Sequence, residues 1–200
     1  MTRYALKILR SQPLRLVLTV AGIALCVLLM LFLLAIYYGV EYGTMEFIRQ
    51  NRADLWVVQK NAENILRHVS VLLMNDADAI RQMPEVESVS PLVMLISGIK
   101  KDHRILTIFL AGYDPSHSLG GPPRIAAGRA VVSDDEIVLD RAFAKKHGFH
   151  VGDSVQILDH RLKVVGLSDG TNSFVVQYVF VTLRRAQAIF GFPSMVTAYL

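Results

Sequence analysis

The sequence predicts an α+β protein in which one N-terminal membrane-spanning helix precedes a mixed domain of short helices and more numerous strands. Residues Leu16 to Val40 carry no charge, as expected for a helix inside a bilayer. After residue 50, short apolar runs with period-two alternation recur between turn residues, which is typical of strands. Segments with helical spacing between these runs are short, so the domain is α+β rather than a helical bundle.

The uncharged segment is too long for a cleaved signal peptide. As a helix it reaches ~37 Å at ~1.5 Å per residue, more than the ~30 Å of bilayer hydrocarbon. The apolar core of a signal peptide has only about 7–15 residues and ends in small residues. Here the segment ends with the bulky Tyr37 and Tyr38, which are typical of a membrane interface. We therefore expect a retained transmembrane helix over residues 14–40.

Basic residues before the span predict its orientation. Arg3, Lys7, Arg10 and Arg15 precede it with no acidic residue. By the positive-inside rule the N-terminus is cytoplasmic, and residues 41–200 form a domain on the outer side of the membrane. The first three cations share one arc, which predicts a cytoplasmic amphipathic helix over residues 1–13 on the membrane lipid, ended by Pro13. A frayed basic tail is the open alternative.

Charge and cysteine content narrow the partners further. The net charge of +4 comes from the first fifteen residues, since the remainder is balanced. The high pI therefore reflects topology, and no nucleic-acid partner is expected. Cys26 is the only cysteine and lies within the span, so the outer domain has no disulfide framework.

The outer domain is expected to contain nine strands and three short helices after a helical continuation at Tyr42–Asn51. The strands are predicted at Ala53–Lys60, Val86–Val89, Leu92–Lys100, Arg104–Tyr113, Glu136–Leu139, Ser154–Leu158, Arg161–Leu167, Val175–Val181 and Val196–Leu200. The helices are predicted between Asn75 as N-cap and Pro84, at Arg141–His147 between Asp140 and Gly148, and at Leu183–Phe190. In the first of them, Ile80 and Met83 should face inward. A division into two lobes near Gly120–Pro123 is left open.

No motif for catalysis or cofactor binding is present in the sequence. There is no Gly-x4-Gly-Lys-Ser/Thr run for ATP and no nucleophile elbow around Ser133-Asp134-Asp135. Candidate metal ligands are His147, His150 and His160, with Asp153 and Asp159. Their placement around turns instead predicts solvated side chains. Lys145-Lys146 and Arg184-Arg185 are interpreted as solvated helix faces. We expect no catalytic, cofactor-binding or metal-binding residue, no cofactor and no enzyme.

Several segments in this order resemble a known family. They are Arg52-Ala53-Asp54-Leu55-Trp56-Val57-Val58, Met83-Pro84-Glu85-Val86-Glu87-Ser88-Val89-Ser90-Pro91, Glu136-Ile137-Val138-Leu139-Asp140, Phe143 to Val155, and Lys163-Val164-Val165-Gly166. The chain resembles the MacB-like periplasmic core domain of ABC-transporter permeases of the MacB/FtsX-like family, with the DevC-like branch the most similar. Each motif also has a plain structural role in a turn or a core, so the resemblance identifies a scaffold rather than a chemical site.

The resemblance implies a permease subunit that couples cytoplasmic ATP hydrolysis to export or extraction of a hydrophobic or lipid-like substrate through movement of periplasmic domains. It implies four spans, a second permease copy in a dimer, a cytoplasmic ABC ATPase subunit and, for the DevC-like branch, a periplasmic adaptor and an outer-membrane duct. This chain stops within the outer domain and lacks three spans, so it is expected to be a fragment or a truncated gene product. The alternative is a single-pass membrane protein with an extracytoplasmic binding or sensing domain.

Overall fold

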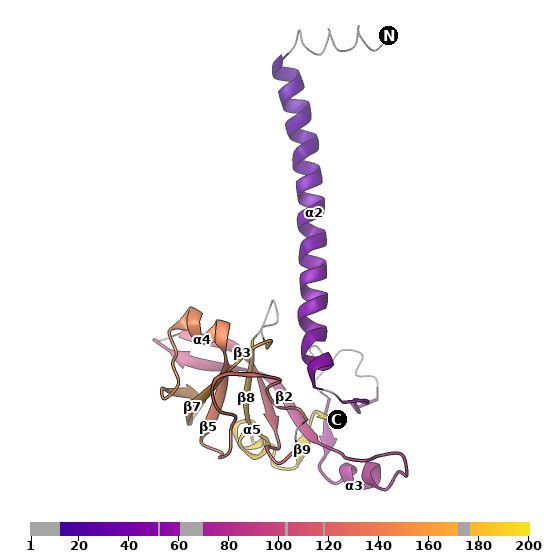
Figure 1. Cartoon of the computed structure of the whole chain (residues 1–200), viewed down its shortest axis with the longest axis vertical. Coiled ribbons are helices and arrows are strands. Elements are labelled where there is room, and N and C mark those ends of the chain that lie inside the picture. The colour runs from indigo at the N-terminus through magenta and orange to yellow at the C-terminus, as the bar shows by residue number, and fades with distance from the viewer. Residues whose placement is uncertain (1–12, 52, 61–69, 103, 118, 172–176) are drawn as a thin grey trace. The chain divides into compact units, whose positions relative to one another are not determined.

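A computed structural model of the chain describes residues 13–51, 53–60, 70–102, 104–117, 119–171 and 177–200 (Figure 1). The chain divides into two compact units, Met1–Tyr42 and Gly43–Leu200. The amphipathic helix predicted over residues 1–13 lies outside the described residues, apart from Pro13.

The longest element is the helix α2, Pro13–Gln50, whose 38 residues reach roughly 57 Å. It begins at Pro13, where proline is favoured because the first turn of a helix lacks partners for its N–H groups. The predicted apolar helix and its predicted continuation beyond Tyr42 thus form one uninterrupted element.

The remaining described elements alternate short helices with strands. In chain order they are β1 (Leu72–Leu73), α3 (Asp76–Arg81), β2 (Pro91–Lys101), β3 (Arg104–Tyr113), β4 (Ile125–Gly128), β5 (Glu136–Asp140), α4 (Arg141–His147), β6 (Ser154–Ile157), β7 (His160–Ser168), β8 (Tyr178–Thr182), α5 (Leu183–Phe190), β9 (Met195–Val196) and β10 (Ala198–Tyr199). The predicted α+β fold class is confirmed.

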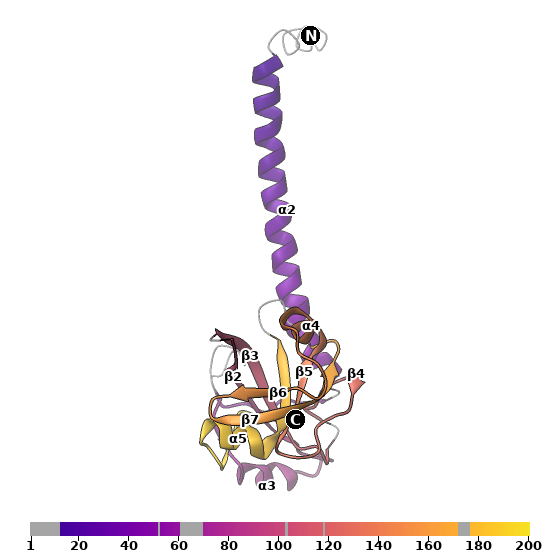
Figure 2. The ribbon, with the colours of Figure 1, turned by 90° about the vertical axis from the view of Figure 1, so that its left-hand side faces the viewer.

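Among the described strands, six close into a ring. The main sheet follows the order β10-β2-β3-β8-β5-β7-β4, and β6 pairs with both β2 and β7. The pairings therefore run from β2 through β3, β8, β5, β7 and β6 back to β2. Two of these pairs, β3 with β8 and β5 with β7, are parallel. Figure 2 shows β6 and β7 crossing in front of the other strands.

The strand ring separates two hydrophobic clusters, because successive side chains of a strand point to opposite faces. One cluster takes alternate residues such as Ile108 and Leu110 together with Phe143 of α4 and Ile189 of α5. The other takes the intervening residues, such as Phe109, and is covered by Trp56 and Leu119 from the connecting segments. The helices α4 and α5 lie at opposite ends of the strand ring in both views (Figures 1 and 2).

Local sequence signals position α4 and α5. The Asp140 carboxylate accepts the Phe143 N–H at 2.9 Å, and α4 ends at Gly148 in the left-handed conformation with φ 65°. The Lys101 ammonium, 4.2 Å from the Phe149 ring centroid, donates to backbone carbonyls at the same helix end. Thr182 caps α5 by accepting from the Arg185 N–H at 3.1 Å. Both helices have the predicted bounds.

Two predicted strands are wrong. Ala53–Lys60 forms only one bridge, Val57 to Tyr199, because the neighbouring β10 has two residues and cannot support a longer ladder. Within this segment, the Leu55 side chain is 73% exposed. Val86–Val89 is irregular: a turn after Pro84 delivers Val89 into the core without strand pairing.

The other predicted strands differ from the observed ones in smaller ways. The strand predicted at Val196–Leu200 is divided, since β9 pairs with β1 whereas β10 pairs with β2. The turn before β7 falls at Leu158 and Asp159, with Leu158 at φ 50°. The start of the strand predicted at Val175 lies outside the described residues, and β8 begins at Tyr178. The strand β4 was not predicted.

The helix α3 is present, but two expected roles are wrong. Asn75 occupies the N-cap position without a side-chain hydrogen bond; the Asp76 carboxylate instead accepts the Leu73 N–H at 3.0 Å. Met83 is 53% exposed, because α3 ends at Arg81 and the chain has left the helical face before Met83. Residues 43–200 form one compact unit, and the possible division near Gly120–Pro123 is not found.

Candidate functional site

The helix α2 is the first functional element, because its apolar surface has no protein partner in the described chain. From Pro13 to Gly39 it is long and apolar enough to cross a membrane. None of the most apolar stretch within these residues is buried by protein. Side chains all around it are exposed, among them Leu18, Leu28 and Phe32 at 56% or more. A helix that is apolar all round belongs in a core or a membrane, and this one is outside the core.

The sequence-selected histidines do not converge. His147 packs on Phe143 with ring centroids 4.7 Å apart, and His150 lies beside Asp153, at 3.8 Å. His160 instead contacts the Arg185 guanidinium at 3.0 Å. Across the described residues, no group of three or more His, Cys, Asp or Glu side chains is arranged to hold a metal ion.

The pair Arg184-Arg185 has a structural role that the sequence did not indicate. The Arg185 side chain is only 19% exposed and donates to the Asp134 carbonyl and the Asp135 carboxylate, both at 2.5 Å. Arg184 binds the Asp134 carboxylate, which also accepts the Thr182 hydroxyl at 2.5 Å. The Thr182 hydrogen bond, followed by the two guanidinium groups, lowers the pKa of Asp134. The interpretation of these arginines as a solvated face is therefore wrong for Arg185.

Beside the Ser133-Asp134-Asp135 run, Glu136 holds a second structural cluster, which includes the Ser133 N–H. Glu136 accepts from both Arg129 guanidinium nitrogens and from the Val132 N–H at 2.8 Å. These bonds, with that of Arg129 the largest contribution, lower the pKa of Glu136 to about 2. The cluster fixes the path of the chain between β4 and β5.

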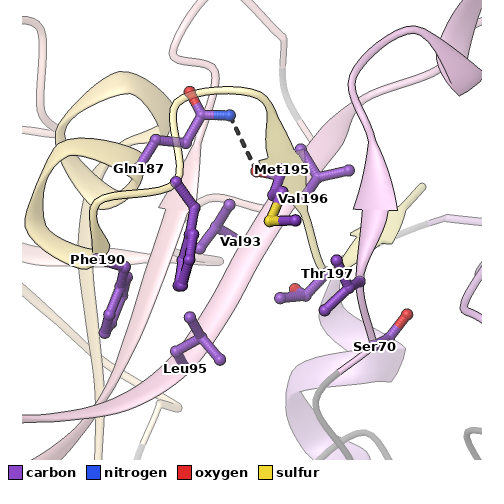
Figure 3. Close-up of a pocket in the computed structure, with 10 residues that line it drawn as sticks. Ser70, Val93, Leu95, Gln187, Phe190, Met195, Val196 and Thr197 are labelled. Atoms are coloured by element: carbon purple, nitrogen blue, oxygen red, sulfur yellow. Dashed lines mark hydrogen bonds between the residues drawn. The ribbon is translucent and has the colours of Figure 1, made fainter.

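An apolar pocket lies beside α5 in the domain (Figure 3). Its volume is about 230 Å³, and four segments line it: Ser70–Val71, β2, α5 and the stretch that follows α5. The lining residues are Ser70, Val71, Val93, Leu95, Gln187, Phe190, Phe192, Met195, Val196 and Thr197. Its floor is core, since Val93 and Val196 are at most 4% exposed, whereas Val71 and Phe192 at its mouth are 41% and 52% exposed.

Sequence reasoning missed this pocket because its walls come from three distant stretches of the chain. Val93 and Leu95 lie on one face of β2, Phe190 comes from α5, and the Gln187 amide of α5 extends to the Met195 carbonyl (Figure 3). The second wall depends on the antiparallel pairing of β1 with β9, Leu72 with Val196. The exposed Phe192 directly after the Gly191 helix end was the one available signal, and it does not identify its neighbours.

Comparison with known proteins places this geometry among membrane transport proteins. The family described as "MacB-like periplasmic core domain" matches residues 16–199. ABC transporter permeases from the CDC 1551 / Oshkosh and H37Rv strains of Mycobacterium tuberculosis are each 26% identical over 190 residues, covering 92% of this chain and 52% of theirs. The chain therefore spans about half the length of the curated relatives it matches.

Two solved structures show a similar fold. The periplasmic region of MacB from Actinobacillus actinomycetemcomitans gives a TM-score of 0.56 at 16% identity, over 76% of this chain and 75% of that one. The extracellular domain of the noncanonic ABC-type transporter YknZ from Gram-positive bacteria gives 0.52 at 13% identity, over 72% and 79%. The predicted resemblance to the MacB/FtsX-like permease family is confirmed, and the greater similarity to the DevC-like branch stays a prediction.

Proposed function

Because this chain belongs to the family of the MacB-like periplasmic core domain, we propose that it is the N-terminal part of an ABC-transporter permease subunit. The permease couples cytoplasmic ATP hydrolysis to export or extraction of a hydrophobic or lipid-like substrate by moving its outer domains. The similarity to permeases over 92% of the chain supports this proposal. In this assignment the chain contributes no bond-making chemistry, since hydrolysis belongs to the ATPase subunit.

The observation that carries the proposal is the continuity of α2. One helix runs without interruption from Pro13, through the apolar stretch, to Gln50. A continuous helix transmits displacement along its axis because its backbone hydrogen bonds resist bending. We propose that residues 14–40 cross the bacterial inner membrane, that the N-terminus is cytoplasmic, and that residues 41–200 are outside.

The proposed partners follow from this role. They are a cytoplasmic ABC ATPase subunit, a second permease copy, the surrounding membrane lipid and, if the DevC-like resemblance extends to assembly, a periplasmic adaptor and an outer-membrane duct. The first of these partners is tested by co-purification of the ATPase with the complete permease. A strain that lacks the permease is the negative control.

Topology is tested with single cysteines in a Cys26→Ser background. A membrane-impermeant maleimide added to intact cells should label Val132→Cys, which replaces a side chain 74% exposed in the domain. Ser11→Cys should react only after lysis. Labelling of Ser11→Cys but not Val132→Cys in intact cells would reverse the proposed orientation and remove the transporter assignment with it.

Mechanical coupling is tested in the complete transporter by Met45→Pro. Met45 lies in α2 beyond the apolar stretch, and proline there removes a backbone hydrogen bond and clashes with the preceding turn, at about 3 kcal/mol or more. We expect ATP hydrolysis to persist while the export phenotype restored by the wild-type gene is lost. Met45→Leu is the matched control and should behave as wild type. Full complementation by Met45→Pro would contradict the role of α2 in transmission.

A further inference from the structure

We infer that the apolar pocket between α5 and Met195–Thr197 binds the alkyl chain of an amphiphile. The inference rests on the proposed function for its biological meaning, because it names the place where a lipid-like substrate is held by the outer domain. Binding itself is a property of the fold and can be measured without ATP hydrolysis.

The surface that lines the pocket is almost entirely apolar. Three polar side chains reach the pocket, and each already has a partner within the domain. Gln187 donates to the Met195 carbonyl at 3.0 Å, as Figure 3 shows, and Ser70 accepts the Gln59 N–H at 2.8 Å. Thr197 donates to the Leu92 carbonyl at 3.1 Å and accepts the Met94 N–H at 2.8 Å. A polar ligand would give up its hydration for this largely apolar surface, so the pocket favours an apolar group.

The volume fits a short length of hydrocarbon. An apolar cavity of roughly 150 Å³ lined by Leu, Ile and Phe stays dry and takes up benzene. The pocket here is larger, about 230 Å³, and its floor is formed by core residues. It therefore has room for more aliphatic carbon than benzene supplies.

The pocket is open at one end, which suits an amphiphile rather than a compact apolar solute. Its floor is closed by Val93 and Val196, whereas Val71 and Phe192 meet solvent at the mouth. A ligand with an alkyl chain and a polar head places the chain on the floor and leaves the head in water. Each methylene that leaves water for the pocket floor favours binding.

The walls can adjust to chains of different shape. Met195 lines the pocket, and its unbranched thioether fills irregular spaces. The wall contributed by Val71 is held to β9 by a two-residue ladder, in which Leu72 pairs with Val196 and Leu73 with Met195.

The test uses the full chain in lipid nanodiscs and decanoic acid carrying a diazirine near its terminal carbon. After irradiation, mass spectrometry should locate labelled residues within 70–71, 93–95 and 187–197. Unlabelled decanoic acid should reduce this labelling at least fivefold, whereas butanoic acid at the same concentration should have little effect, because its chain is too short to reach the floor.

Two substitutions make the test specific. Val71→Trp fills the mouth from an exposed position and should reduce pocket labelling at least fivefold; Val132→Trp, the same exchange at an exposed site outside the lining, should leave it unchanged. Phe192→Ala provides a second lining variant, expected to weaken labelling without filling space. Circular dichroism of each variant confirms that the fold is retained.

The outcomes separate this inference from the proposed function. Labelling confined to α2, or equal labelling of Val71→Trp and Val132→Trp, overturns the pocket assignment and leaves the transporter assignment in place. Labelling of the pocket in a chain that fails the topology test overturns the transporter assignment and leaves the binding site. Loss of labelling in Val71→Trp with retention in Val132→Trp supports the site.

Discussion

The helix α2 and the domain at Gly43–Leu200 expose similar apolar side chains for different reasons. Leu28 in α2 is 61% exposed and Leu73 in the domain is 53% exposed. In α2, exposed apolar residues surround the whole helix, whereas in the domain they are isolated or lie near the mouth of the pocket. Single exposed apolar side chains are normal on a surface that faces water. A continuous apolar surface around a whole helix instead indicates an apolar environment such as lipid.

The largest expected difference between the two regions comes from placing a charge at these leucines. Leu28→Arg puts a cation near the middle of the span and should disfavour membrane insertion by about 2.5–3.5 kcal/mol. Leu73→Arg keeps the cation in water and should change the free energy of unfolding by less than about 0.5 kcal/mol. Resistance to carbonate extraction measures insertion in both variants. Equal extraction of the two would show that α2 is not surrounded by lipid.

A smaller difference is expected between two glycines. At Gly112 a new Cβ would overlap the Ala186 Cβ of α5, so Gly112→Ala should destabilise the domain by about 1–3 kcal/mol. At Gly22 in α2 a Cβ meets nothing within 4 Å, so Gly22→Ala should favour helix by about 0.5–1 kcal/mol. The urea midpoint of domain unfolding, measured by circular dichroism of the chain in nanodiscs, should shift only for Gly112→Ala. A shift of the same size in both variants would contradict the close approach of α5 to β3.

The smallest effect concerns pH and the domain alone. Hydrogen bonds from Arg129 and from the Val132 and Ser133 N–H groups lower the pKa of Glu136 to about 2 from 4.5. A lowered carboxyl pKa stabilises the fold above pH 4.5, and this contribution disappears as the pH falls toward 2. Because Arg129 is exposed, we expect less than about 1 kcal/mol.

The comparison of wild type with Glu136→Gln measures this contribution. The difference in their urea midpoints should be largest at pH 6 and should shrink steadily between pH 4.5 and 2.5. Asp78→Asn, which removes an exposed ion pair with Arg81, controls for general effects of acid. A difference that does not change with pH would assign the stabilisation to packing rather than to charge.

Local signals were sufficient wherever one segment contains its own explanation. Asp140 and Gly148 delimit α4 as predicted, and the hairpin of β2 and β3 follows from two alternating runs around a tight turn. Signals failed where the partner decided the outcome. Ala53–Lys60 alternates like a strand but meets only the short β10, so it forms a single bridge at Val57.

The pocket shows the same limit at the level of a site. Val93 and Phe190 carry no individual mark of a site, and they line a common pocket only because α5 packs beside β2. The role of Arg185 was also hidden, since a pair of adjacent arginines gives no indication that distant carboxylates will enclose one of them.

By itself, the sequence determined the elements whose causes are local: the uncharged helix with its basic flank, the capped helices and the ordered motifs that identify the family. Only the tertiary structure decided the closure of the strand ring by β6, the division of the last residues between β9 and β10, and the apolar pocket. The physical reason is that helix caps and lipid-facing surfaces depend on residues close in the chain. Strand partners and cavities depend on contacts between residues far apart, which local periodicity does not specify.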